Sequence, residues 1–242
     1  MSDYNLNLMN LFYTPDIVGQ YYTLSPEESK HCIRVLRFTE GEPVSLVDGR
    51  GNWYNGVIDR PDARGCGVKV LEKMTNYGCR SFRLHLAIAP TKNIDRIEWM
   101  LEKCTEIGID EITLLNTEHS ERKVVKEERL EKVIIAAMKQ SLKAYLPKLN
   151  SLTEFRTFIA SCGEVQKLIA HCHEGEKKRL DEVYQMGNDV VILIGPEGDF
   201  SEAEVALAER HRFIPVTLGT SRLRTETAGL VACHSVNFMN RI

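Results

Sequence analysis

The residues with the clearest potential for chemistry lie in a loop near the C-terminal end of the chain. An apolar run, residues 190–194, ends at the sequence Gly195-Pro-Glu-Gly198, and Ser201 and Glu204 then have the spacing of a helix capping box. Open α/β sheets bind ligands in loops of this kind, at the carboxyl ends of buried strands. The loop carries two acidic side chains and lacks a phosphate-binding glycine motif, so it favours a cationic or hydroxyl-rich ligand. An ordinary strand-to-helix turn is the alternative interpretation.

A second polar loop follows another apolar segment and leads into the last helix. It contains Gly219, and Arg224 and Glu226 lie two residues apart where the helix is expected to begin. An arginine is unfavourable near the positive end of a helix dipole, which indicates a functional role for Arg224. A solvated surface pair of Arg224 and Glu226 is the alternative, because such pairs are common and contribute little.

A parallel sheet would bring the two loops to one edge. After residue 75, apolar segments alternate with stretches of helical period, which is typical of a mostly parallel sheet covered by helices. The predicted strands are residues 84–89, 111–115, 167–171, 190–194 and 215–218. Apolar or small residues recur at helical spacing at Ile94, Ile97, Leu101 and Cys104, and again at Leu130, Val133, Ala137 and Ser141.

The first part of the chain has a different pattern. Residues 11–75 contain short β segments, turn residues and one helix, which is typical of a small barrel. Residues 44–47 and 53–58 flank a glycine-rich turn and predict a β-hairpin. We therefore expect two domains, residues 1–75 and 76–242.

The single helix of the first domain is a candidate for RNA contact. Ser25, Pro26 and Glu28 predict its start through a capping box. A basic stripe follows at i, i+4 and i+7, formed by Lys30, Arg34 and Arg37, which could follow an RNA backbone or form a solvated helix face. His31, on the same helix, either packs in the core or contacts RNA.

Composition excludes several classes of protein. The longest apolar run has six residues, 133–138, against the roughly 20 that a membrane-spanning helix needs, and the N-terminus shows no secretory signal. We therefore expect a cytoplasmic protein without membrane association. Seven scattered cysteines without a Cys-x-x-Cys pair argue against disulfides and a zinc ribbon, and we expect no metal site, although His171 and His173 are adjacent candidates. With 31 basic and 34 acidic residues, the chain is not a globally basic nucleic-acid binder.

Four motifs together resemble one family. They are Gly195-Pro-Glu-Gly198, Leu218-Gly219 with Leu223-Arg-Thr-Glu-Thr-Ala228, Lys103-Cys-Thr-Glu-Ile-Gly108, and His31 with Val35-Leu-Arg37. Together, in a match that runs along the chain from about Met9 to the end, they resemble the ribosomal RNA small-subunit methyltransferase E family of the SPOUT superfamily. Residues 1–8 precede the usual start of that family.

The resemblance implies a fold and a function. The fold would be α/β, with a C-terminal SPOUT-type parallel sheet containing a trefoil knot and a small N-terminal PUA-like β-barrel that binds RNA. The activity would be transfer of a methyl group from S-adenosyl-L-methionine (SAM) to N3 of a uridine in 16S rRNA of assembled 30S subunits. The product would be 3-methyluridine.

The resemblance also implies site residues. The cofactor pocket would be lined by Ile194, Gly195, Pro196, Glu197, Gly198, Leu218, Gly219, Leu223, Arg224, Thr225 and Ala228. Removal of the N3 proton needs a base or electrostatic help, so Glu226 is the candidate base and Arg224 the candidate stabiliser of charge on the uracil oxygens. Lys92 and Arg122 are further candidate RNA contacts. The chain departs from the family pattern at Asp199, Lys139 and Lys143.

Similar proteins bury their last helix across a two-fold interface, and here that helix carries Val231, Phe238 and Met239. We therefore expect a homodimer. Two other functions stay open from the sequence. One is a non-catalytic RNA-binding or ribosome-assembly protein that kept the fold, and the other is a SPOUT methyltransferase for another RNA base.

Overall fold

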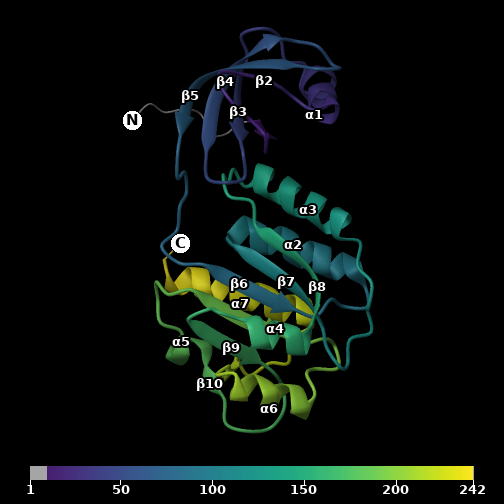
Figure 1. The fold of residues 1–242 in the computed structure, drawn as a ribbon, viewed down its shortest axis with the longest axis vertical. Helices are drawn as coiled ribbons and strands as arrows, with labels where there is room; N and C mark the ends of the chain where they lie inside the picture. The colour runs from purple at the N-terminus through teal and green to yellow at the C-terminus, as the bar shows by residue number, and fades with distance from the viewer. Residues whose placement is uncertain (1–9, 242) are drawn as a thin grey trace. The chain divides into compact units, whose positions relative to one another are not determined.

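The computed structural model describes residues 10–241, so residues 1–8 of the sequence analysis lie outside the described part. The chain forms two compact units (Figure 1). The first extends to Cys79 and also includes Met138–Leu146, and the second comprises Arg80–Ala137 and the chain from Pro147 onward. None of the helices in residues 10–241 combines the length and the apolar character that crossing a membrane requires.

A five-stranded sheet forms the first unit. Its strand order is β1-β3-β4-β5-β2, with bounds β1 Leu11–Tyr13, β2 Tyr21–Thr23, β3 Pro43–Val47, β4 Trp53–Arg60 and β5 Gly67–Met74. Strands β3 and β4 pair antiparallel, which confirms the predicted hairpin. Phe12, Leu46, Ile58 and Val68 are at most 1% exposed and belong to one core cluster of this unit.

The helix of the first unit begins where the sequence predicts but ends differently. In α1 (Pro26–Lys30), the Ser25 side chain accepts a hydrogen bond from the Glu28 N–H. The Glu28 carboxylate does not complete a capping box and instead pairs with Lys139. The helix continues as a π-helix, η2 (His31–Val35), and Arg37 lies beyond it with φ of 60°.

The prediction that Lys30, Arg34 and Arg37 form a stripe on one face of a single α-helix is therefore wrong. The wider π-turn changes the angular spacing after Lys30, and Arg37 is not helical. Lys30, Arg34, Arg37 and also His31 are exposed, so His31 is not a core residue.

Residues 138–146 belong to the first unit, although the sequence analysis placed them in the second domain. The reason is packing: Met138 and Ala144 are buried in a cluster with Val47 and Trp53. A β-bridge between Arg50 and Tyr145 adds backbone pairing. Because these packing partners lie far apart in the sequence, no local residue pattern shows that residues 138–146 belong to the first unit.

A seven-stranded sheet forms the second unit. Its order is β10-β12-β9-β11-β6-β7-β8, and every neighbouring pair is parallel. The bounds are β6 Leu84–Ile88, β7 Glu111–Asn116, β8 Lys148–Glu154, β9 Gln166–Ala170, β10 Lys178–Arg179, β11 Val190–Ile194 and β12 Ile214–Thr217. The five predicted strands are therefore present, each within one or two residues of its predicted ends.

Two strands of this sheet carry no strand signal in the sequence. β8 and β10 are the two outer strands, and neither contains a fully buried residue. Because an outer strand has a neighbour on one side only, polar residues are tolerated along it. Their pairing partners, β7 and β12, determine that they are strands.

Helices cover both faces of the parallel sheet (Figure 1). On one face, α2 (Ile94–Ile107) packs against α7 (Thr225–Met239), which also contacts β6 and β11. Gly229 permits this close approach, because a Cβ there would lie 2.7 Å from the Met100 sulfur and 3.1 Å from Ile88. The remaining helices are α3 (Glu127–Gln140), α4 (Phe155–Ser161), α5 (Leu180–Val183) and α6 (Glu202–Arg210).

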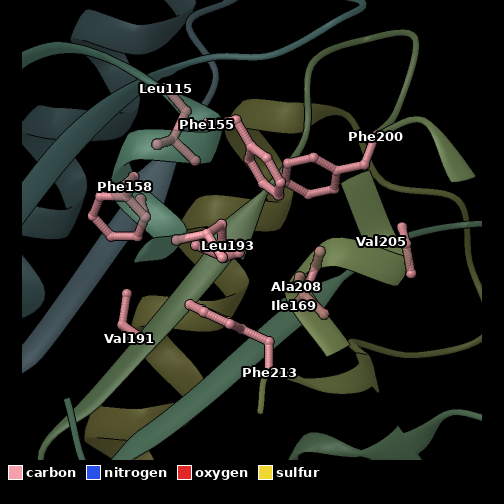
Figure 2. Packing of buried hydrophobic residues seen from close by; sticks show 12 residues of the cluster. Leu115, Phe155, Phe158, Ile169, Val191, Leu193, Phe200, Val205, Ala208 and Phe213 are labelled. Atoms are coloured by element: carbon pink, nitrogen blue, oxygen red, sulfur yellow. The ribbon is translucent and has the colours of Figure 1, made fainter. Parts of the chain in front are cut away.

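The opposite face of the sheet is covered by α4 and α6, and its core positions the loop after β11. Phe200 follows that loop, is fully buried and packs on Phe155 with ring centroids 5.4 Å apart (Figure 2). Residues from the sheet and both helices complete this cluster. The capping box of Ser201 and Glu204 at the start of α6 is present as predicted. The loop is therefore held by a buried ring on its C-terminal side and by β11 on its N-terminal side.

Candidate functional site

A hollow of the second unit lies at the carboxyl ends of β9, β11 and β12. This large cavity measures about 790 Å³ and is also lined by the segment leading into α7. Its position agrees with the expectation that the two polar loops meet at one edge of a parallel sheet. Ligand-binding cavities typically have roughly 300–1,000 Å³, so its size suits one small molecule.

Most residues predicted to contact a cofactor line the large cavity. They are Ile194, Gly195, Pro196, Glu197, Leu218, Gly219, Leu223, Arg224, Thr225 and Ala228. Gly198 is not among the lining residues. Its carbonyl oxygen lies 3.1 Å from the His119 Nδ1, and a Cβ at Gly198 would lie 3.1 Å from the His119 Cβ.

The loop after β11 is fixed by hydrogen bonds of Asp199. This residue has φ of 63°, in the left-handed region that glycine adopts more readily. Its carboxylate accepts hydrogen bonds from the N–H of Cys172 at 2.7 Å and of Phe200 at 2.8 Å. Asp199 therefore connects the loop after β11 to the loop after β9, which offsets the strain of a non-glycine residue here.

Glu197 is exposed and anchors a neighbouring loop. Its carboxylate accepts a hydrogen bond from the Lys92 N–H at 3.0 Å. The Lys92 ammonium forms an ion pair with Glu121 at 2.9 Å. The Arg122 guanidinium donates to the carbonyl oxygens of Thr91, at 3.0 Å, and of Lys92. Lys92 and Arg122, predicted as RNA contacts, are thus already engaged in shaping the loop beside the large cavity.

The loop after β9 also lines the large cavity, and the sequence analysis did not assign it to a cofactor. Both ring nitrogens of His171 are buried and have no hydrogen-bond partner within the described residues. Burial, together with the positive charge of Lys177, lowers the pKa of His171, so its neutral ring is favoured. The sequence did contain a signal for this loop, because the loop follows an apolar strand, as the loops after β11 and β12 do.

No group of three residues suited to hold a metal ion occurs in the part of the chain that the structure describes. His173, the other metal candidate, has its Nε2 2.5 Å from the carbonyl oxygen of Phe200. The His173 ring thus connects the loop after β9 to the residue that follows the loop after β11.

The start of α7 brings Arg224 and Glu226 next to α2. Arg224 is the N-cap residue of α7 and is exposed, whereas the Glu226 side chain is only 9% exposed. The Glu226 Oε1 lies 3.9 Å from the Arg96 Nε, and its Oε2 is buried without a hydrogen-bond partner in residues 10–241. Buried polar atoms are nearly always hydrogen-bonded, so an unpartnered carboxylate oxygen indicates a place where a donor from a ligand can bind.

Glu226 is one of the residues that line a second hollow of about 610 Å³. The helix α2 contributes Asp95, Arg96 and Trp99 to its lining, the segment before α7 contributes Arg222 and Arg224, and α7 itself contributes Glu226. The second hollow adjoins the large cavity, because Arg96, Arg222 and Arg224 line both. Two ligands could therefore meet across these arginines.

The residues of the large cavity fit SAM. The unpartnered ring nitrogens of His171 can hydrogen-bond a polar ligand, and Asp199 and Glu197 supply negative charge that suits a sulfonium cation. The same acidic residues disfavour a polyphosphate. Backbone at Gly195 and Gly219 can approach a ligand closely, because neither carries a side chain.

An all-parallel α/β sheet with a small-molecule cavity at its strand ends, adjoined by a hollow lined by a buried carboxylate, is the arrangement in which α/β enzymes bind a cofactor or substrate. Comparison with known families narrows this class. The RNA methyltransferase domain family matches residues 79–237, and the RNA methyltransferase PUA domain family matches residues 24–71.

Curated relatives and solved structures agree with these matches. Ribosomal RNA small subunit methyltransferase E 1 of Borreliella burgdorferi is 32% identical over 236 residues, covering 94% of this chain and 95% of the relative. A crystal structure described as a "probable rRNA-methyltransferase" from Porphyromonas gingivalis is 45% identical, with a TM-score of 0.91, and the match covers 96% of this chain and 99% of that one. Ribosomal RNA small subunit methyltransferase E of Neisseria gonorrhoeae, solved with SAM bound, is 25% identical, with a TM-score of 0.86 and coverage of 96% and 98%.

The chain belongs to the ribosomal RNA small subunit methyltransferase E family. The resemblance noted in the sequence is thereby confirmed, as is an α/β fold with a PUA-like N-terminal domain.

Proposed function

We propose that this protein transfers a methyl group from SAM to N3 of a uridine in small-subunit rRNA of the assembled subunit. The large cavity is the cofactor site, and the second hollow receives the uracil. Membership of the family supports the cofactor and the RNA substrate. The observation that carries the assignment of N3 is the buried, unpartnered Oε2 of Glu226 beside the cofactor site.

Uracil offers the donor that this oxygen lacks. Its N3–H is the one ring donor on the Watson–Crick edge, and a carboxylate accepts hydrogen bonds only. Cytosine has an unprotonated N3 that would face the carboxylate with a lone pair. Glu226 would therefore favour uracil over cytosine and accept the N3 proton.

The residues of this chain prepare the acceptor nitrogen. Glu226 accepts the proton from N3, and Arg224, which lines both hollows, stabilises the negative charge that develops on the uracil oxygens. When bound, SAM supplies an electrophilic methyl group, to which N3 bonds as the carbon–sulfur bond breaks and its electron pair remains on sulfur. The cofactor loops, anchored by Phe200 and Asp199, hold the site in place.

Substrate binding would extend to the first unit. Lys30, Arg34 and Arg37 are exposed and take part in no ion pair within residues 10–241, so they are available to RNA phosphates. In the second unit, Lys92 is exposed beside the cofactor site and its ammonium can also contact RNA, with Arg122 holding its loop. We place the protein in the cytoplasm, where it would have access to ribosomal subunits. We also expect its second unit to contain the trefoil knot typical of SPOUT proteins.

The exposed face of α7 supports a homodimer. Phe238 is 72% exposed and its ring stacks on that of His234, at 5.9 Å between centroids. Val231, two turns before Phe238 on the same face, is partly exposed, as is Met239, which directly follows Phe238. A Phe238→Asp variant should shift the mass measured by light scattering from dimer to monomer. A monomeric parent protein at micromolar concentration would refute the homodimer.

Primer extension on methylated rRNA tests the proposed function. Small subunits purified from cells that lack the protein are incubated with the protein and SAM, and reverse transcriptase then reads the rRNA. A methyl on N3 removes the Watson–Crick donor and stops extension, so one new stop at a uridine is expected. Glu226→Gln should weaken this stop while leaving SAM affinity by calorimetry intact. A methylated base without a stop, or a stop at cytidine, would contradict the assignment of N3 of uridine.

A further inference from the structure

Trp99 is unusual among the apolar residues of α2. Ile97, Met100 and Leu101 on the same helix are fully buried, whereas Trp99 is 44% exposed. An exposed aromatic ring suits a binding surface when other ligand-binding groups lie beside it. The ring lines the second hollow, together with the buried carboxylate of Glu226.

The chemistry around Trp99 suits one unstacked nucleotide. The hollow combines an aromatic ring, a hydrogen-bond acceptor without a partner, and the guanidinium groups of Arg96, Arg222 and Arg224. Proteins bind single-stranded RNA by stacking bases on aromatic rings, by hydrogen bonds to base edges and by cationic contact with phosphates. Groups suited to all three kinds of contact line one hollow of the second unit.

We propose that Trp99 is a stacking platform for the uracil that is methylated. This inference rests on the proposed function and extends it, because it identifies a residue that binds the uracil by stacking on the flat face of its ring. A base paired in a duplex cannot present N3, so the target must be extruded, and stacking compensates part of the lost stacking in RNA. Trp99 does not line the large cavity, so its role is separable from cofactor binding.

The alternative occupant of this surface is a second copy of the chain. The start of α7 lines the second hollow, and the exposed apolar face of the same helix is the proposed dimer interface. The experiment must therefore separate stacking on a base from packing on a partner.

Fluorescence isolates Trp99, because the chain has only two tryptophans and Trp53 is 1% exposed in the first unit. In a Trp53→Phe background, single-stranded oligouridylate should quench the Trp99 emission. An oligomer of 5,6-dihydrouridine keeps the N3–H but lacks a planar aromatic ring, so it should quench much less. Equal quenching by both, or none by oligouridylate, would overturn the proposal.

Kinetics on small subunits provide the second measurement. Trp99→Ala should lower kcat/KM for small subunits by about 5- to 150-fold, the range for loss of one base–aromatic contact, and leave the SAM Kd unchanged. Trp99→Phe should recover most of the loss. Val165→Ala, at an exposed apolar residue outside both hollows, is the matched control and should have no effect.

The outcomes distinguish this inference from the proposed function. If the parent protein does not methylate small subunits, the proposed function fails. If the parent methylates and Trp99→Ala matches it, only the stacking role fails. If Trp99→Ala loses activity and also dissociates the dimer by light scattering, the ring packs against a second copy and the stacking role is refuted.

Discussion

Glu226→Gln should separate activity from stability in this protein. Glutamine has the shape of glutamate but cannot take a proton at neutral pH, so methylation should fall by about 10²-fold or more. The stability of the second unit should not fall with it. The reason is the position of the carboxylate, which is 9% exposed and has one oxygen without a partner in residues 10–241.

The expected size of the stability change follows from these contacts. Leaving a buried acceptor unsatisfied costs about 1–3 kcal/mol, and more for a charged group. The one favourable contact, Arg96 at 3.9 Å, involves a guanidinium that is 39% exposed, and such a pair contributes roughly 0.2–1 kcal/mol. Replacing the charge by a neutral amide should therefore raise the free energy of unfolding by about 1 kcal/mol. For a chain of this length, that corresponds to an increase in Tm of about 2–4 °C.

Two measurements on the same preparation check this prediction. Calorimetric melting gives the Tm of the unit that contains α7, and transfer of a labelled methyl group to small subunits gives turnover. Glu209→Gln, at an exposed residue of α6, is the control and should change neither. A Tm lowered by several degrees would show that Glu226 is a structural residue, and parental turnover would show that the proton leaves by another route.

Three further predictions follow from the contacts of the second unit. Phe200→Ala should destabilise the protein by about 3–5 kcal/mol and weaken SAM binding, measured by denaturant unfolding and calorimetry; unchanged SAM affinity would show that the loop does not depend on this ring. Asp199→Gly relieves a left-handed residue but removes the hydrogen bond to Cys172, so SAM affinity should fall about 10-fold, and an increase would mean that strain dominates. A hydrogen bond from His85 lowers the pKa of Glu164 to about 2, so this carboxylate stabilises the fold above its unfolded pKa near 4.5, and the stabilisation is lost as pH falls toward 2. Glu164→Gln should thus lower stability by about 2 kcal/mol at pH 7 and much less at pH 2.5, and an equal loss at both would contradict the ionic contribution.

The central strands could be predicted because their residues carry the signal themselves. β6 and β11 are buried at every position, and β11 has the predicted bounds. A strand covered on both faces is mostly apolar, so its sequence indicates its environment; the one polar residue of β6, His85, has both ring nitrogens within hydrogen-bonding distance of partners, Glu164 and Thr113. β8 is an outer strand with polar residues, and its pairing with β7 is visible only in the folded sheet.

The first unit shows the same division. The hairpin β3–β4 and the start of α1 at Ser25 follow from local turn and capping preferences. The continuation as a π-helix does not, and this is why the expected stripe through Arg37 was wrong. The inclusion of residues 138–146 depends on apolar contacts with residues almost a hundred positions away, which no local pattern encodes.

Residue types along the chain were enough to predict the two loops that line the large cavity, because polar residues after a buried parallel strand lie at the sheet edge whatever the rest of the fold is. It also placed Arg224 and Glu226 at the start of one helix. That Glu226 is buried, with its Oε2 lacking a partner among residues 10–241, and that Trp99 lines the same hollow follow from the folded chain alone, because α2 and α7 meet through packing between segments more than a hundred residues apart. Burial and unsatisfied hydrogen bonding are properties of these contacts, and a linear pattern of residue types does not contain them.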